Sequence, residues 1–374
     1  MTRLSSALPF WISLVLLPLA AIGAQFGGWT VFLLPLYGWV GISLLDAAVG
    51  QNHKNPDPQT PEGDLFWYRL ITLAWFPIQV LALYGTIWWV THHDTLSLWE
   101  RIVLFFGLGV ISGSIGITYA HELMHQKNRL ERWLGDLLLA TVLYSHFRTE
   151  HLLVHHRYVG TPRDAVTARY NEGFHRFFPR VLREGPVSAW RAERQMLARA
   201  DRTMWHPSNP FWRYATLQAL ALAAAYAAGG WAGLALFCWQ ALVAVWQLEL
   251  VNYVEHYGLT REHLGDGRYE PVRPHHSWNA DHAASNWMLI NLQRHSDHHC
   301  RPDRRFPLLQ TYGPGDAPQL PLGYPAMTAL AMIPPLWRRR MNPRVRAWRR
   351  AFYPGISDWS DYNRGRLPMP RGAS

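Results

Sequence analysis

The stretch from Tyr214 to Leu248, YATLQALALAAAYAAGGWAGLALFCWQALVAVWQL, contains no Asp, Glu, Lys or Arg. A helix needs about 20 predominantly apolar residues to cross a bilayer, so this stretch is nearly long enough for two crossings. Its Gly229-Gly230 pair is a point where the chain turns at little conformational cost. The stretch therefore predicts two membrane helices joined by a tight turn, the second of which continues past Glu249.

Three further uncharged stretches extend this prediction to six membrane spans. They cover residues 4–45, 70–93 and 102–121, and the longest of them again contains a glycine pair, at 27–28. The expected spans lie near residues 8–27, 29–49, 68–91, 101–122, 213–229 and 231–254. Buried helices of a large soluble protein are the alternative, and two separate uncharged stretches of double length argue against it.

The distribution of positive charge predicts the orientation of these spans. The expected turns near residues 25–28, 92–98 and 227–232 contain no Lys or Arg, whereas the opposite side carries many. By the positive-inside rule both termini are then cytoplasmic. We expect an all-α integral membrane protein that forms one integrated domain. Its spans lie in residues 1–122 and 213–254, and its cytoplasmic sections, which form a helical cap, are residues 123–212 and 255–374.

The charge and the cysteine content limit the classes of molecule that we expect the chain to bind. The formal net charge of +10 lies mainly on the expected cytoplasmic side, where anionic lipid and an acidic soluble protein are better partners than nucleic acid. The two cysteines, Cys238 and Cys300, do not form a CxxC pair. The chain therefore has no cysteine-ligated iron centre of its own, and any redox chemistry needs electrons from outside.

Nine of the nineteen histidines fall into four clusters. The clusters are HELMH, HLLVHH, the histidine of NYVEHYGL, and RHSDHH, which give His121, His125, His151, His155, His156, His256, His295, His298 and His299. The predicted topology puts all nine on one side of the membrane. Neutral imidazole binds iron, copper, nickel and zinc, and nine ligands exceed the need of one ion. The clusters therefore predict a two-metal site, with di-iron as the first choice.

The spacing within the clusters makes a definite structural prediction. His151, His155 and His156 are spaced i, i+4, i+5, and the last cluster is spaced i, i+3, i+4, so we expect each triplet to share one helix face. HELMH alone also matches the HExxH signature of zinc proteases, but that chemistry leaves six clustered histidines without a role. A metal transporter or metal store is a further alternative that involves no catalysis.

Several other residues are candidates near the site. Metal-bound imidazoles usually donate their second N–H to a carboxylate or carbonyl, and the carboxylates beside the clusters are Glu122, Glu150, Asp164, Glu255 and Asp297. For His275, His276 and His282 we expect an outer or fold-stabilising role. Substrate-channel candidates are Tyr37, Gly38 and Trp39, where a small residue lies between bulky ones on an apolar helix. The apolar segment 323–337 is expected to be an interfacial anchor.

These motifs resemble those of the membrane-bound alkane hydroxylases (alkane 1-monooxygenases) of bacteria, within the membrane fatty acid desaturase and hydroxylase superfamily. The matching stretches are HELMH, EHLLVHHRYVGTP (150–162), NYVEHYGL (252–259), DGRYE (266–270), PHHSWN (274–279) and LQRHSDHH (292–299). Leu152-Leu153-Val154 departs from the family by replacing a more polar stretch, which we expect to alter the substrate pocket.

The resemblance implies a six-span inner-membrane enzyme with two non-haem iron ions held by the nine histidines. It implies insertion of one oxygen atom of O₂ into the terminal C–H bond of an n-alkane. It also implies electrons from NAD(P)H through a reductase and rubredoxin. The alternatives within the superfamily are a fatty-acyl desaturase and a xylene-type aromatic side-chain hydroxylase, which differ in their oxidised products.

Overall fold

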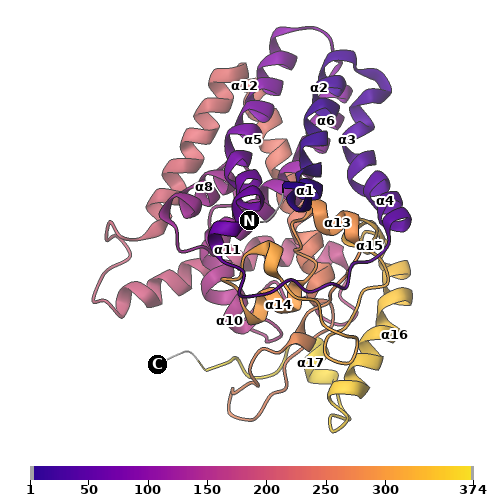
Figure 1. Cartoon of the computed structure of the whole chain (residues 1–374). Helices are drawn as coiled ribbons and strands as arrows, with labels where there is room; N and C mark the ends of the chain where they lie inside the picture. Colours follow the sequence, from indigo (N-terminus) through magenta and orange to yellow (C-terminus); the bar gives the residue numbers. More distant parts are fainter. Residues whose placement is uncertain (1–3, 372–374) are drawn as a thin grey trace.

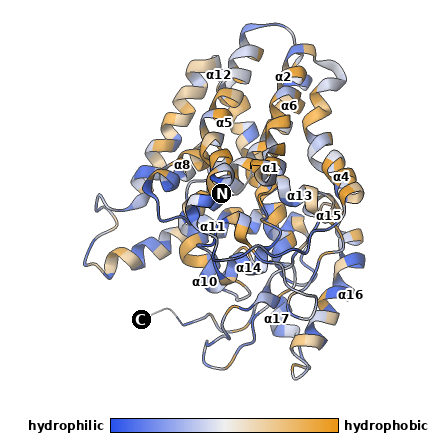
Figure 2. Ribbon diagram, in the orientation of Figure 1, coloured by the Kyte–Doolittle hydropathy of each residue, from blue (hydrophilic) through white to orange (hydrophobic). Residues whose placement is uncertain are grey.

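The computed structural model describes residues 4–371, and this part of the chain is helical (Figure 1). Within these residues extended backbone forms three isolated bridges and no strand. Long helices form the upper layer in Figure 1, and shorter helices and loops form the lower layer. Figure 2 shows that the upper layer is mainly apolar and the lower layer mainly polar. The predicted all-helical fold is confirmed.

Five helical segments among the described residues are long and apolar enough to cross a membrane, one fewer than expected. They are Leu4–Phe26, Gly28–Val49, Glu62–His92, Leu98–Met124 and Pro210–His256. The difference arises because the last segment, α12, contains both of the final two expected spans in 47 residues. A straight helix of this length would extend about 70 Å, more than twice the apolar thickness of a bilayer of about 30 Å.

The backbone of α12 is broken at the glycine pair that the sequence singled out. Gly229 and Gly230 have non-helical backbone angles, and φ of Gly230 is +57°, a conformation that favours glycine. A Cβ atom on Gly233 would lie 2.7 Å from the carbonyl oxygen of Ala225, so the chain on the two sides of the break is tightly packed. The expected turn in the double-length stretch is therefore present.

The other long segments are built from consecutive helical pieces. The first contains α1 (Leu4–Ala7), η1 (Leu8–Val15) and α2 (Leu16–Phe26), and the second contains η2 (Gly28–Phe32), α3 (Leu33–Pro35), the π-helix η3 (Leu36–Gly41) and α4 (Ile42–Val49). The third contains η4 (Glu62–Leu65) and α5 (Phe66–His92), and the fourth contains α6 (Leu98–Ile111), the π-helix η5 (Ser112–Gly116) and α7 (Ile117–Met124).

The lower layer contains the remaining helices. They are α8 (Arg129–Ala140), α9 (Phe147–Glu150), the π-helix η6 (His151–His155), α10 (His156–Tyr158), α11 (Phe174–Ala198), η7 (Pro274–His276), α13 (Ala283–Met288), α14 (His295–Cys300), η8 (Phe306–Leu308), α15 (Tyr324–Ala331), α16 (Pro334–Phe352) and α17 (Ser360–Arg364). Figure 1 shows α10 and α14 beneath the long helices.

Close backbone packing fixes the ends of two long helices near each other. A Cβ atom on Gly109 would lie 2.6 Å from the carbonyl oxygen of Gln240, and one on Gly113 would lie 2.5 Å from that of Ala244. Only glycine permits this approach of α6 and η5 to α12. The contact aligns the lower ends of the two segments, which carry the first and sixth of the clustered histidines.

The segment 323–337, whose composition suggested an interfacial anchor, has one face buried in the protein. Tyr324, Met327 and Trp337 have exposed fractions of 1%, 0% and 0%, and α15 packs against α12. Ile333 and Leu336 have exposed fractions of 49% and 46%, so the interfacial role of the segment stays a prediction. Sequence composition alone does not distinguish burial in protein from burial in lipid.

Candidate metal centre

The structure brings all nine clustered histidines together in two adjoining groups. The first group contains His121, His125, His151, His156 and His298, and the second contains His155, His256, His295 and His299. Within each group one ring nitrogen of every histidine lies within 4.8 Å of the others. Eight of the nine residues come from α7, η6, α10, α12 and α14, and His125 follows directly after α7.

The nitrogen distances in the first group fit a shared metal ion. Nε2 of His151 lies 2.9 Å from Nε2 of both His121 and His156, and 3.1 Å from Nε2 of His125. One imidazole nitrogen has either a proton or a lone pair, so it cannot form three hydrogen bonds to three converging nitrogens. Metal–nitrogen bonds of about 2.1 Å place adjacent ligands of an octahedron about 3.0 Å apart. Five histidines also exceed the four ligands of a tetrahedral site.

The second group has the same geometry with one ring fewer. Nε2 of His295 lies 3.2 Å from Nε2 of His256 and 3.0 Å from Nε2 of His299. Nε2 of His155 is buried and has no hydrogen-bond partner among the described residues. Glu255 contributes a carboxylate oxygen 3.3 Å from Nε2 of His295. Because Glu255 adjoins the converging nitrogen rather than the opposite side of the ring, it lies closer to the centre than an outer carboxylate would.

Each histidine triplet, which was expected to share one helix face, is divided between the two groups. His151 and His156 belong to the first group, whereas His155 belongs to the second. In the last cluster His298 joins the first group, and the other two rings join the second. Each triplet therefore contributes to both groups, so the two groups adjoin each other along the same two short segments.

A π-turn explains how His151 and His156 come to face the same way. In a regular α-helix, residues five apart point in different directions. Here the N–H of His156 donates to the carbonyl of His151, an i to i+5 hydrogen bond that places these residues above one another. The ring of His155 is stacked beside that of His151, with centroids 5.2 Å apart, and belongs to the second group. The π-turn is visible only in the structure, because the sequence spacing alone is compatible with an α-helix.

Asp164 is the outer carboxylate that contacts a clustered histidine. Its Oδ2 accepts hydrogen bonds from Nδ1 of His155 at 3.0 Å and from the Thr167 hydroxyl at 2.7 Å, and its Oδ1 accepts one from the N–H of Val166 at 3.0 Å. Burial raises the pKa of Asp164, but attraction and hydrogen bonding to His155, with the Thr167 hydroxyl, outweigh it and leave the pKa lowered. The ionised carboxylate keeps the proton of His155 on Nδ1, so that Nε2 presents its lone pair.

Three of the predicted outer carboxylates form no hydrogen bond or ion pair with a clustered histidine within the described residues. Glu122 accepts a hydrogen bond from the Gln126 side chain at 3.1 Å, which also argues against a protease-type base in HELMH. Asp297 accepts bonds from Arg304 and from the Tyr312 hydroxyl. Burial and the negative charges of Asp164 and Glu249 raise the pKa of Glu150. Proximity in sequence was therefore a poor guide to contact.

The electrostatics of the groups keep the rings neutral. Burial lowers the pKa of His125 to about 3, and repulsion by His155 contributes. Burial, followed by repulsion between neighbouring rings, also lowers the pKa of the other clustered histidines outside the long segments for which a shift is resolved, namely His151, His156, His295, His298 and His299. A neutral ring retains the lone pair that a metal requires.

A third cluster, Glu270, His275 and His276, lies apart from these groups. Nε2 of His276 lies 2.7 Å from the Tyr353 hydroxyl, which also lies 3.1 Å from Nε2 of His275 and donates to Glu270. The N–H of Arg273 donates to Nδ1 of His276. These bonds connect η7 to the residue that follows α16, in agreement with a fold-stabilising role for His275 and His276. His282 is half-buried beside α13 and is in neither histidine group.

The predicted channel residues lie in η3 with unequal access to a cavity. Gly38 and Trp39 line a small cavity of about 10 Å³ that reaches Tyr324 between η3, η5, α12 and α15. Tyr324, which the sequence analysis missed, faces the carboxylate of Glu255. Tyr37 is half-buried and lies outside the lining of this cavity. No sequence signal marked Tyr324, because its position depends on the packing of α15 onto α12.

Apolar membrane-type helices that end at two buried histidine groups define a class of membrane metalloprotein. The family model described as fatty acid desaturase matches residues 97–331, which include all nine histidines.

Full-length relatives identify the family more closely. The chain is 41% identical over 314 residues to alkane 1-monooxygenase 2 of Pseudomonas aeruginosa, with 82% of each chain covered. It is 37% identical over 350 residues to alkane 1-monooxygenase 2 of Alcanivorax borkumensis, with 91% of this chain and 90% of the relative covered. It is 26% identical over 333 residues to the xylene/toluene monooxygenase hydroxylase component of Pseudomonas putida, with 87% and 86% covered. The chain belongs to the alkane 1-monooxygenase family of membrane enzymes.

Proposed function

We propose that this protein is a non-haem di-iron monooxygenase that hydroxylates the terminal carbon of medium- and long-chain n-alkanes. The two groups of converging Nε2 atoms, five in one and four in the other, carry this proposal. The reaction takes one alkane, one O₂, two electrons and two protons, and yields one 1-alkanol and one water. Iron bound by the histidines would activate O₂ and supply the oxidant, because no side chain attacks an unactivated C–H bond.

The nine histidines are the proposed ligands, one iron ion for each group. Glu255 is a proposed additional oxygen donor or proton-holding group at the second iron, because its carboxylate lies 3.3 Å from Nε2 of His295. Asp164 is proposed to orient His155. Burial of these groups beneath the long helices supports a site from which bulk water is largely excluded.

An alkane offers no polar group, so its binding rests on apolar burial worth about 0.8 kcal/mol per CH₂. We propose that the cavity beside Gly38 and Trp39 belongs to the route from the bilayer to the irons. The support is that Tyr324 lies in its lining and faces Glu255. Tyr37 remains a proposed neighbour of this route.

The proposed membrane arrangement has six spans with both termini and the iron site on the cytoplasmic side of the bacterial inner membrane. The break at Gly229 and Gly230 supports two spans in α12. The lack of Lys and Arg in the turns at the opposite end supports the orientation. The lower layer would then be a cytoplasmic cap beneath the membrane lipid.

Electrons are proposed to come from rubredoxin and its NAD(P)H-dependent reductase. Cys238 lies in α12 and Cys300 at the end of α14, and both are free. The chain thus has no cysteine pair with which to hold a redox centre in its described part. A soluble carrier must deliver the electrons one or two at a time.

The test is reconstitution of the purified protein with reductase, rubredoxin, NADH and n-alkanes of graded length. Chromatography should detect 1-alkanols, and the substitutions His256→Ala and His298→Ala should each abolish their formation. His175→Ala is the matched control, because this exposed histidine on α11 belongs to neither group. Full activity of either ligand variant would remove the assignment.

Product identity separates the related activities. Incubation with xylene and with a fatty-acyl substrate in the same system tests benzylic hydroxylation and desaturation. The identity to the xylene/toluene relative makes the first of these the relevant second candidate. A benzylic alcohol or an olefin formed faster than 1-alkanols would replace alkane hydroxylation as the principal activity.

A further inference from the structure

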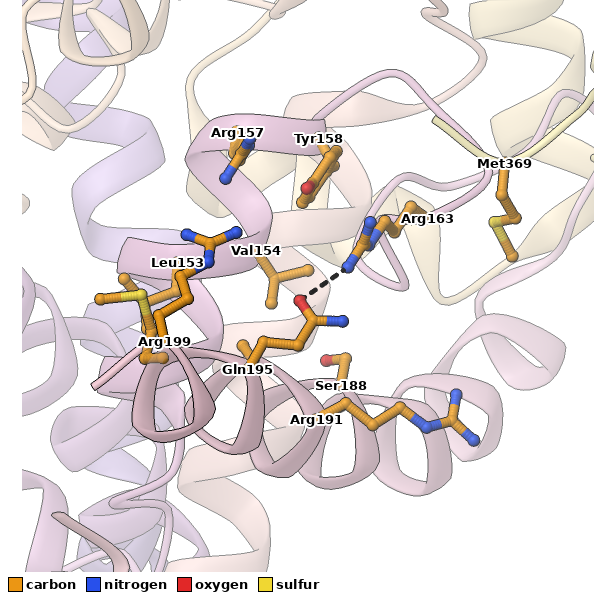
Figure 3. Close-up of a pocket in the computed structure, with 12 residues that line it drawn as sticks. Leu153, Val154, Arg157, Tyr158, Arg163, Ser188, Arg191, Gln195, Arg199 and Met369 are labelled. Atoms are coloured by element: carbon orange, nitrogen blue, oxygen red, sulfur yellow. Dashed lines mark hydrogen bonds between the residues drawn. The ribbon is translucent and has the colours of Figure 1, made fainter. Parts of the chain in front are cut away.

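A basic cavity lies on the outer side of the segment that carries three of the clustered histidines (Figure 3). Its volume is about 320 Å³. One wall comes from η6 and α10, the other comes from α11, and the C-terminal segment adds Met369. The arginines among its lining residues are Arg157, Arg163, Arg191 and Arg199.

The charge of the cavity is entirely positive, because its lining contains four arginines and no Asp or Glu. The carboxylates on the adjacent helix α11 are engaged elsewhere. Glu184 pairs with Arg180 and Arg183, and Glu193 accepts a hydrogen bond from Thr149. The cavity therefore favours an anionic partner.

The shape of the cavity is fixed by contacts between its walls. The guanidinium of Arg163 stacks over the ring of Tyr158 at 4.4 Å and lies 3.4 Å from the side-chain oxygen of Gln195 on the opposite wall (Figure 3). Arg157 and Arg191 are exposed at the surface. An apolar and aromatic floor beneath exposed positive charges is typical of protein interfaces, in which Arg, Tyr and Met are enriched.

The floor of the cavity lies directly behind the candidate metal site. Leu153 and Val154 line the cavity and lie between His151 and His155 in η6. One turn of helix therefore separates a docked molecule from a ligand of the first group and a ligand of the second. Electron transfer slows steeply with distance, so a short path of this kind suits an electron donor. Leu153 and Val154 also belong to the departure that we expect to alter the substrate pocket, and that expectation stays a prediction.

We propose that this arginine-lined cavity is the docking site of a small acidic one-electron carrier protein. The inference rests on the proposed function, because the hydroxylation consumes two electrons per alkane and the carrier must therefore dock twice in each turnover. Carboxylates of the carrier pair with the exposed Arg157 and Arg191, and its apolar contact residues meet Leu153, Val154 and Met369. Both electrons pass through η6 to the irons on its other side.

A matched pair of charge reversals tests the proposal. Arg191→Glu changes a residue of the cavity, whereas Arg194→Glu makes the same change on an exposed residue of α11 outside its lining. In the reconstituted enzyme, Arg191→Glu should raise the KM for reduced rubredoxin about tenfold at low salt and leave kcat at saturating rubredoxin within about twofold. Arg194→Glu should leave both within about twofold. Equal effects of the two substitutions on KM would overturn the proposal.

Salt dependence and a second variant provide an independent readout. Since exposed charges are screened over about 10 Å at 0.1 M ionic strength and about 3 Å at 1 M, the difference between the two variants should shrink as salt is added. Arg157→Glu on the opposite wall should reproduce the effect of Arg191→Glu. A salt-independent rise in KM, or no effect of Arg157→Glu, would count against docking in the cavity.

Direct binding separates this proposal from the proposed function and from a lipid site. Thermophoresis of labelled rubredoxin with the iron-loaded protein should show weaker binding to the Arg191→Glu variant than to the unsubstituted protein. This result is expected even if no alkane is hydroxylated, and the proposed function alone would then fail. Nanodiscs of neutral and of phosphatidylglycerol-rich composition test the other source of negative charge. If the substitution changes the affinity for the anionic bilayer but not for rubredoxin, the cavity binds lipid headgroups and the proposal is overturned.

Discussion

Replacement of Asp164 by Asn tests whether the second histidine group binds its own metal ion. One oxygen of the Asp164 carboxylate accepts two hydrogen bonds. One comes from the protonated Nδ1 of His155 at 3.0 Å, and the other comes from the Thr167 hydroxyl at 2.7 Å. An amide keeps the shape and can keep the bond from the N–H of Val166. It removes the negative charge, however, and it allows the ring to accept at Nδ1 and carry its proton on Nε2. That tautomer cannot bind a metal through Nε2.

The magnitude follows from the cost of losing an outer partner of a metal ligand. Such losses typically reduce metal affinity about 10- to 100-fold, which corresponds to about 1.4–2.7 kcal/mol. Only the second group should be affected, because the clustered histidine to which Asp164 is hydrogen-bonded is His155, a member of that group. The variant should therefore bind one iron ion with unchanged affinity and the other 10- to 100-fold more weakly.

Iron content in Fe(II) buffers, measured after rapid desalting, is the appropriate assay. The free iron concentration is set near the dissociation constant that the second site has in the unsubstituted protein. Under these conditions the variant should hold about one iron per chain, and the unsubstituted protein should hold clearly more. Asp297→Asn is the control, because this carboxylate binds Arg304 and Tyr312 instead of a histidine. Equal loss in both variants, or loss of both irons together from the Asp164 variant, would refute the reasoning.

Three further predictions follow from individual contacts. Because burial lowers the pKa of His125 to about 3, its neutral form persists on acidification, so iron content should be unchanged between pH 7 and pH 5; a loss centred near pH 6.5 would contradict this. Gly38→Trp projects a large ring from a position whose Cβ would lie 3.8 Å from Val110, so the longest alkane converted should become shorter, and an unchanged product profile on chromatography would remove Gly38 from the route. Tyr353→Phe removes the hydroxyl that donates to Glu270 and should lower the free energy of unfolding by about 1–3 kcal/mol in thermal or denaturant melts. Burial raises the pKa of Glu270, but its hydrogen bonds outweigh this effect and lower the pKa to about 2. The stabilisation from the ionised carboxylate is therefore complete above about pH 4.5 and disappears as the pH falls towards 2. A Tyr353→Phe variant as stable as the original protein at pH 7 would count against the contact.

The sequence predicted the features that depend on composition and local backbone chemistry. Uncharged stretches located the long helices, and the glycine pairs located their turns, because both signals act over a few neighbouring residues. The break at Gly229 and Gly230 was therefore predictable to the residue. The nine candidate ligands were also found, because their clustering is a property of the sequence itself.

The features that the sequence did not predict depend on contacts between distant segments. Asp164 contacts His155, whereas Asp297, which is adjacent to His298 in sequence, binds Arg304. Tyr324 faces Glu255 only because α15 packs against α12. No periodicity or spacing encodes these choices, because each depends on which element arrives on which side of the site.

The division of both triplets between the two histidine groups has a consequence for how the site is built. The segment from His151 to His156 contributes to both groups, and so does α14 from His295 to His299. Any displacement of either segment therefore alters both groups at once, and neither group can be assembled by one segment alone. The i to i+5 hydrogen bond between His151 and His156 brings these two rings together, so that one short segment supplies ligands to both groups. A helix of regular α geometry would separate these two rings, so the π-turn, and not the histidine spacing alone, makes a pair of adjoining centres possible in this sequence.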